Sequence, residues 1–157
     1  MTSEEKDVIV EMVKDCFNKF KPQLPPMLFV VKEDKNEAFI LDFPNEKAKN
    51  AFTQWLSKNV LDGTFKRFAL VTESYSTSCS DKENLEKLME IDPEDRPNTK
   101  EVIFILFSSP TEEYSLSADI TIDYKGNRQL GEFVKQEPTH TSGRFTNMFK
   151  KALSIKN

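Results

Sequence analysis

Residues that could ligate a transition metal or perform histidine chemistry are scarce in this chain. Its 157 residues include one histidine, His140, and two cysteines, Cys16 and Cys79. One imidazole and two thiols cannot build a Cys/His zinc site or a two-histidine iron site. A Ser-His-acid triad would have to use His140, which no GxSxG motif accompanies. We therefore expect neither a transition-metal site nor a catalytic triad.

Glycine and long apolar runs are scarce as well. The four glycines form no GxGxxG motif and no P-loop, so we expect no nucleotide cofactor. No apolar run approaches the ~20 residues that cross a bilayer, and the segment after Met1 is acidic and polar, unlike a secretory signal. Without an export signal, a cytoplasmic location and free thiols at both cysteines are expected.

The charge balance is acidic and uneven. A net charge of −4 argues against duplex DNA or an anionic membrane as the main partner. From Lys125 onward, seven Lys or Arg and two Glu give 7 − 2 = +5, so the preceding part carries −9. This basic C-terminal segment could meet an acidic ligand or dock on the acidic body of its own chain. With 38% hydrophobic and 31% charged residues, the composition is typical of one globular domain over residues 1–157.

The segment Lys100–Ser109 is the most informative for the fold. Its six consecutive apolar residues, Val102–Phe107, place apolar side chains on both faces of an extended strand. A strand that is apolar on both faces is covered on both faces. We therefore predict a central strand here, paired on both sides.

The remaining elements follow from periodicity and from capping signals. A capping box at Thr2–Glu5 opens a helix to about Phe20, and Pro44 and Asn45 open a second helix to Leu61. A short helix is predicted from Ser80 and a final amphipathic helix over Phe145–Leu153. The other predicted strands are Met27–Lys32, Glu37–Phe43, Phe65–Tyr75, Tyr114–Asp123 and Arg128–Val134.

This succession predicts an α+β fold in the order α-β-β-α-β-(α)-β-β-β-α. Strands that follow one another without crossover helices form a mostly antiparallel sheet, here of five to six strands, with helices packed on it. In Tyr114–Asp123 the alternation predicts two sets of side chains. Those facing inward are Tyr114, Leu116, Ala118, Ile120 and Ile122, and those facing outward are Ser115, Ser117, Asp119, Thr121 and Asp123.

Carboxylates are the remaining candidates for chemistry. Asp119 and Asp123 share one strand face, and Asp123 and Lys125 have the (D/E)-x-K spacing of metal-dependent nucleases, in which acids hold Mg²⁺ and the lysine stabilises developing charge. The same spacing also occurs at Glu4–Lys6 and at Glu33–Lys35, so it is not specific.

Glu73 is a second type of candidate. It shares a strand face with Ala69, Val71 and Tyr75, so we expect its carboxylate in partly covered space, where it must be paired or have a raised pKa. Arg67 or Arg96 could pair with it. Glu101, which opens the central strand, is the other acid of this type. An ion pair at the end of the sheet and a ligand-binding or catalytic acid are both open interpretations.

The residues VTES-Y at Val71–Tyr75, Arg96, and KEVI at Lys100–Ile103 carry a resemblance. Together they are similar to small uncharacterised proteins of bacteria and their phages, in which a strand ending near V-(S/T)-E is followed by a loop and an R-x-x-E-type entry to the next strand. The resemblance covers some 40 residues and brings no activity with it. It implies a bacterial or phage origin and an α+β fold around this glutamate.

Two functional hypotheses from different classes follow. The favoured one is a non-enzymatic, acidic, cytoplasmic protein-binding or assembly module of the chaperone, immunity or phage-accessory kind. The alternative is a small metal-dependent hydrolase or nuclease that uses Asp119, Asp123 and Lys125, or Glu73 with Glu101. Self-association as a two-fold dimer is also expected if all helices cover one side and leave a face of Val102–Phe107 open.

Overall fold

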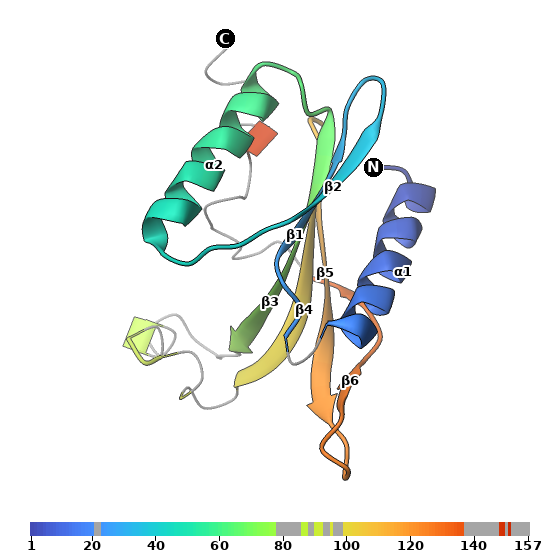
Figure 1. The fold of residues 1–157 in the computed structure, drawn as a ribbon, viewed down its shortest axis with the longest axis vertical. Coiled ribbons are helices and arrows are strands. Elements are labelled where there is room, and N and C mark those ends of the chain that lie inside the picture. Colours follow the sequence, from blue (N-terminus) through green and yellow to red (C-terminus); the bar gives the residue numbers. More distant parts are fainter. Residues whose placement is uncertain are drawn as a thin grey trace.

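The computed structural model describes residues 1–20, 23–77, 86–87, 90–92, 95, 99–136, 148–149 and 151. Across these residues the main elements are two helices and seven strands, and Figure 1 shows their arrangement. The short helix expected from Ser80 and the expected C-terminal helix lie mostly outside the described residues. In chain order the elements are α1 (Ser3–Lys19), β1 (Met27–Val31), β2 (Asn36–Ile40), α2 (Glu46–Leu61), β3 (Arg67–Thr77), β4 (Thr99–Ser108), β5 (Glu113–Ile122), β6 (Arg128–Leu130) and β7 (Val134–Lys135).

The strands form one antiparallel sheet in the order β2-β1-β3-β4-β5-β6, with β7 also paired to β5. The predicted α+β class is confirmed. The central position of Val102–Phe107 is also confirmed, because β4 pairs with β3 on one side and with β5 on the other. The described strands number seven rather than five to six, because the single strand predicted over Arg128–Val134 is divided. Gly131 lies between β6 and β7 and donates its N–H to the Asp119 carbonyl.

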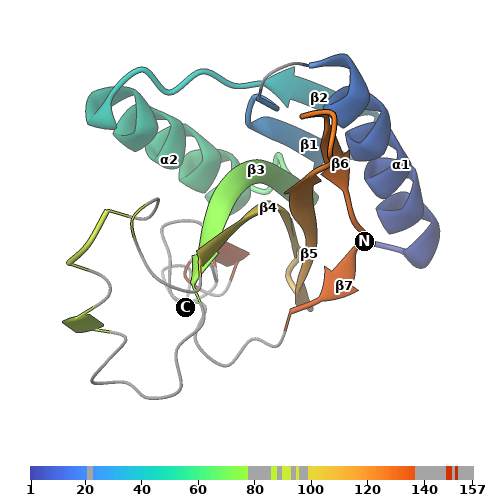
Figure 2. The same ribbon diagram turned by 90° about the horizontal axis from the view of Figure 1, so that it is seen from below.

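The two helices cover opposite faces of the sheet, as Figures 1 and 2 show. Ile9, Val13 and Phe17 of α1 pack in one core cluster with Ile103, Ile105 and Phe107 of β4. Leu56 and Val60 of α2 belong to a second cluster on the other face, which contains Leu106. Both faces of the central strand are therefore covered within one chain, and the condition on which the dimer was expected does not hold.

Local signals explain where both helices begin. The Thr2 hydroxyl accepts a hydrogen bond from the Glu5 backbone N–H, and the Glu5 carboxylate accepts one from the Thr2 backbone N–H. This is the predicted capping box, which satisfies two N–H groups that the first helical turn leaves unpaired. The Asn45 side chain accepts from the Ala48 N–H and caps α2 in the same way.

The prediction for β5 was wrong at three positions. Ile122 does not face inward but is 70% exposed, and Ser115 and Ser117, which were expected to face outward, are buried. The register explains the exposure of Ile122: β4 pairs with β5 only as far as Asp119, and residues 120–122 pair with the short strand β6 alone. The opposite face of β5 is covered near its start, where Gln136 Nε2 donates to Ser117 Oγ at 2.6 Å.

Candidate functional site

Two of the candidate acids meet at one arginine that the sequence did not indicate. The Glu73 side chain is 8% exposed and forms an ion pair with the Arg128 guanidinium, and the second Glu73 oxygen accepts the Leu24 N–H at 2.9 Å. Glu101 Oε2 lies 4.0 Å from the same guanidinium. Arg67, which was one predicted partner of Glu73, pairs with Glu5 instead. Arg96, the other, lies outside the described residues.

Curvature of the sheet makes the Glu73–Arg128 pair possible. Figures 1 and 2 both place β6 beside the C-terminal end of α1, so the β5–β6 hairpin closes over the α1 face of the sheet. The Arg128 guanidinium lies 5.1 Å from the centre of the Phe17 ring in α1. The pair thus connects β3, β6 and the segment before β1. Glu73 also lines an open cavity of about 780 Å³, but both of its oxygens already have partners inside the protein.

The residues of the nuclease hypothesis do not join this cluster. Asp119 Oδ1 pairs with Lys100 at 3.0 Å on the surface of the sheet. Asp123 Oδ1 accepts the backbone N–H groups of Lys125 and Asn127, and its Oδ2 accepts from Gln129. These three bonds shape the β5–β6 turn, in which Gly126 has the positive φ of 83°. The Lys125 ammonium lies 5.5 Å from the centre of the Tyr124 ring rather than at the Asp123 carboxylate.

Within the part of the chain that the structure describes, no three His, Cys, Asp or Glu side chains are grouped so that they could hold a metal ion. His140 and Cys79 are outside that part. Cys16 is a free thiol packed beside the core cluster under α1.

A groove between α1 and β2 has a mostly apolar lining. It has a volume of about 640 Å³, and we call it the α1–β2 groove. Ile9 and Phe29 form part of its lining, and Val8 and Met12 belong to its helical wall. Val8 is 58% exposed. Ile40, which faces the α1 side of β2 two residues beyond the lining residue Ala38, is 65% exposed. The lining residues are Met1, Thr2, Glu4, Glu5, Val8, Ile9, Met12, Phe29, Val30, Val31, Asn36, Glu37 and Ala38.

The strand beside this groove is an edge of the described sheet. The bonds from Lys32 N–H to the Lys35 carbonyl and from Leu41 N–H to the Pro26 carbonyl fix the phase of the β1–β2 ladder. Since hydrogen-bonded pairs alternate in an antiparallel ladder, the N–H and C=O groups of Asn36, Ala38 and Ile40 point away from β1. The side chains of the same three residues face α1, because those between them face α2, where Phe39 packs on Trp55.

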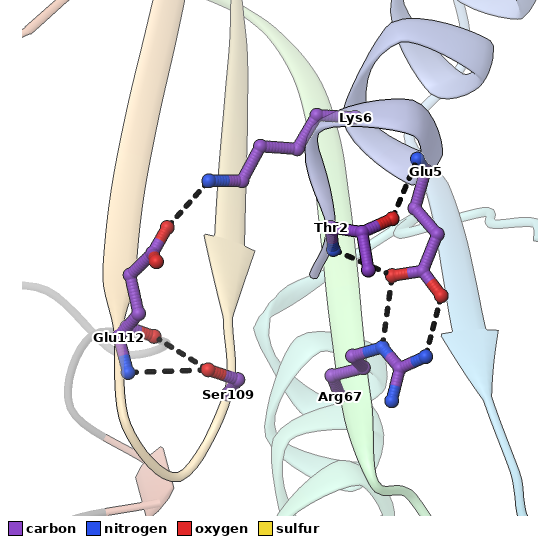
Figure 3. Close-up of polar contacts among 6 residues, drawn as sticks. All are labelled: Thr2, Glu5, Lys6, Arg67, Ser109 and Glu112. Atoms are coloured by element: carbon purple, nitrogen blue, oxygen red, sulfur yellow. Dashed lines mark hydrogen bonds and ion pairs between the residues drawn. The ribbon is translucent and has the colours of Figure 1, made fainter.

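Ion pairs hold the first turn of α1 over the sheet, as Figure 3 shows. The Glu5 carboxylate accepts two hydrogen bonds from the Arg67 guanidinium, including one from Nε at 2.9 Å. Lys6 reaches Glu112 in the β4–β5 turn. The hydrogen bond from Arg67 lowers the pKa of Glu5, and the one from Lys6 lowers the pKa of Glu112. One wall of the groove is thus fixed to β3 and to the β4–β5 turn.

The lowered pKa values of Glu5 and Glu112 predict that the free energy of unfolding decreases in acid. Because their pKa values are lower in the folded chain than the ordinary 4.5, their contribution is present above pH 4.5 and is lost as the pH falls through the folded pKa values. We expect Glu5→Gln with Glu112→Gln to lower the free energy of unfolding at pH 7 by about 0.5–2 kcal/mol in total, since partly exposed pairs are weak. The double variant should also lose less stability than the wild type between pH 5 and pH 3.

Urea titrations at several pH values measure this effect. Glutamine at position 5 can still accept the Thr2 N–H, so the capping box remains and only the charge is removed. Equal acid slopes in the variant and the wild type would show that other carboxylates govern acid unfolding.

The sequence interpretation found Glu73 and Glu101 but missed both Arg128 and the groove. Arg128 lies 55 positions after Glu73, and no local pattern links the two. A signal for the groove was present: Val8 and Met12 lie outside the apolar stripe of Ile9, Val13 and Phe17, and Ala38 and Ile40 alternate with residues that face α2.

Comparisons of this chain with protein-family models, with curated proteins and with solved structures found no match. The resemblance at Val71–Tyr75 and Lys100–Ile103 therefore stays an expectation. No helix in the described part of the chain has the length and apolarity needed to cross a membrane.

Proposed function

We propose that this protein is a non-enzymatic protein-binding module that takes up an extended segment of another protein at the edge of β2. The segment would add a strand to the sheet and place alternate side chains in the α1–β2 groove. This mode of recognition uses backbone hydrogen bonds for affinity and side-chain pockets for specificity. A cytoplasmic location is part of the proposal, and the free thiol of Cys16 agrees with it.

One observation carries the proposal: among the described residues, the outward backbone groups of Asn36, Ala38 and Ile40 have no partner, and Ala38 and Ile40 place apolar side chains on the α1 side. Edge strands that must stay free are protected by charged side chains, proline or bulges. The one charged residue within β2, Glu37, faces the other side, where Lys32 and Lys35 pair with it at 3.0 and 2.8 Å. The groove side of this edge therefore carries no protecting charge of its own.

The hydrolase alternative has less support. Asp119, Asp123 and Lys125 each have a partner within the sheet or its turn, and Glu73 and Glu101 lie near a cation that compensates them. A carboxylate that serves as a general base or metal ligand needs a free oxygen facing substrate. The candidate acids instead act as links between strands.

A matched pair of lysine substitutions tests the proposal. Ile40 and Ile122 are both exposed isoleucines, at 65% and 70%, but Ile122 lies in the β5–β6 hairpin, at the other edge of the sheet from β2. Phage-displayed random dodecapeptides are selected on the wild-type protein, and the affinity of each selected peptide is then measured for Ile40→Lys and Ile122→Lys. Burying an isoleucine is worth about 1.5–3 kcal/mol, so we expect Ile40→Lys to weaken binding by at least about tenfold. Ile122→Lys should bind as the wild type does.

Circular dichroism and thermal unfolding confirm that both variants are folded. A library that yields no binder, or binders that do not distinguish the two variants, would overturn the proposal of a binding site at β2.

A further inference from the structure

We infer that the segment bound at the α1–β2 groove is basic, with apolar residues at alternate positions flanked by lysine or arginine. This inference rests on the proposed function and specifies its partner. It comes from the distribution of charge around the groove, which is acidic along one wall and has no cation in its lining.

The acidic wall belongs to α1. Glu4, Glu11 and Asp15 are spaced by seven and four residues, which places them in one row on a helix, along the solvent side of Val8 and Met12. Of this row, Glu11 is paired with Lys14, at 3.4 Å between two exposed side chains, and such a pair contributes little. The row therefore presents negative charge next to the most exposed apolar side chains of the helix.

The lining of the groove adds no positive charge. Its ionisable residues are Glu4, Glu5 and Glu37, and none of the lining residues is Lys or Arg. The Glu37 side chain faces the α2 side of β2, so only Glu4 and Glu5 add charge on the groove side. Glu5 is compensated by Arg67 and Glu37 by Lys32 and Lys35, whereas Glu4 has no such pair among the described residues. The part of the chain before Lys125, to which all the lining residues belong, has a net charge of −9.

A basic strand with alternating apolar residues fits both the acidic row of α1 and the exposed apolar side chains beside it. When a strand is added to β2, every second side chain lies on the α1 side, against Val8, Met12 and Ile40. Valine-like residues would be buried there. A lysine or arginine at the end of this row could lay its aliphatic stem along the apolar wall while its charged head reaches Glu4, Glu11 or Asp15.

A second copy of this chain fits less well. Its own β2 would present Asn36, Ala38 and Ile40 on this face, with no cation for the acidic row. Antiparallel pairing of two β2 strands would also bring two acidic α1 helices toward the same seam. Charge complementarity therefore favours a basic segment of another protein over a homodimer.

Three synthetic peptides test the inference directly. They share valine at positions three, five and seven and threonine at the even positions, and their first and last residues are both lysine, both glutamine or both glutamate. We expect the lysine peptide to bind roughly tenfold more tightly than the glutamate peptide at low salt, because exposed pairs contribute modestly but add up. The difference should shrink in 0.5 M salt, which screens such pairs. Fluorescence anisotropy measures each dissociation constant.

Two triple variants test whether the preference for the lysine peptide comes from the acidic row of α1. In the variant with Glu4→Gln, Glu11→Gln and Asp15→Asn, the dissociation constants of the glutamate and lysine peptides should differ by about threefold or less. Glu101→Gln with Asp119→Asn and Glu132→Gln changes the net charge by the same amount away from the groove and should leave the ratio of the two dissociation constants as in the wild type.

The outcomes separate the two levels of the proposal. If all three peptides bind equally and Ile40→Lys still abolishes binding, the site is right and the basic partner is wrong. If no peptide binds in a manner that depends on Ile40, the proposed function itself fails. Light scattering tests whether a second copy of the chain occupies the groove. A dimer that forms with rising concentration and is lost in Ile40→Lys would assign the groove to that second copy and overturn the inference.

Discussion

Replacing Glu73 by alanine is expected to lower the free energy of unfolding by about 3 kcal/mol, near the lower end for breaking a buried ion pair. The substitution leaves the Arg128 guanidinium without its nearest carboxylate and the Leu24 N–H without its acceptor. Glu101, at 4.0 Å, offers Arg128 a partial replacement, which is why we do not expect a larger loss. In a chain of this length the melting temperature should fall by about 6–12 °C.

Two comparison variants identify the cause of this loss. Glu73→Gln keeps the size of the side chain and an oxygen for the Leu24 N–H, so the difference between the wild type and this variant reports the loss of the charge. The further difference between glutamine and alanine reports the lost hydrogen bond together with the lost packing. Glu101→Gln alters a half-exposed carboxylate of the same cluster and should cost less than about 1 kcal/mol.

A double replacement tests whether the pair is needed for folding at all. Methionine at both Glu73 and Arg128 removes both charges together, and such apolar replacements of buried pairs are often neutral or better. We expect it to recover most of the stability that Glu73→Ala loses. If instead Glu73→Ala were within 0.5 kcal/mol of the wild type, the carboxylate would not be a structural link, and a role in ligand binding or catalysis would regain support.

Much of the fold could be predicted because its signals are local. The run Val102–Phe107 indicates a strand that is covered on both faces, wherever its neighbours come from. The capping residues Thr2 and Asn45 mark the starts of both helices, since the bonds they make reach only three residues along the chain. The order of strands without crossover helices was enough to predict an antiparallel sheet.

The parts that could not be predicted depend on contacts between distant segments. That α1 and α2 lie on opposite faces is decided by how the whole sheet is covered, and neither helix carries a residue pattern for one face or the other. The same holds for Arg128: it reaches Glu73 only because the sheet curves and β6 closes beside Phe17. The exposure of Ile122 follows from the point at which the β4–β5 pairing ends, at Val102 and Asp119, which no residue of β5 encodes.

The largest loss of stability is expected at Phe68, in the core under α2. Its side chain is fully buried in β3, and its ring lies 5.9 Å from that of Phe149 with the planes 23° apart. Replacing a buried phenylalanine by alanine costs about 3–5 kcal/mol through lost burial and the cavity that remains. Since a domain of this kind is stable by only about 5–15 kcal/mol, Phe68→Ala could unfold a substantial fraction of the chain. Phe68→Leu, with a smaller cavity, keeps the measurement possible in that case.

The contact between Phe68 and Phe149 can be measured separately. It is of interest because Phe149 belongs to the basic C-terminal segment of the chain. In a double-mutant cycle of Phe68→Leu and Phe149→Leu, followed by urea unfolding, we expect a coupling energy of about 0.5–1.5 kcal/mol, the range for paired aromatic rings. Tyr124→Leu, at a residue that is 92% exposed, controls for the loss of an aromatic side chain and should change stability by less than about 0.5 kcal/mol. A coupling near zero, with Phe149→Leu as stable as the wild type, would show that Phe149 does not pack on β3. Measurable coupling would mean that this basic segment docks on the sheet through an apolar contact. That result would support the interpretation that the segment packs on its own chain rather than binding an acidic ligand.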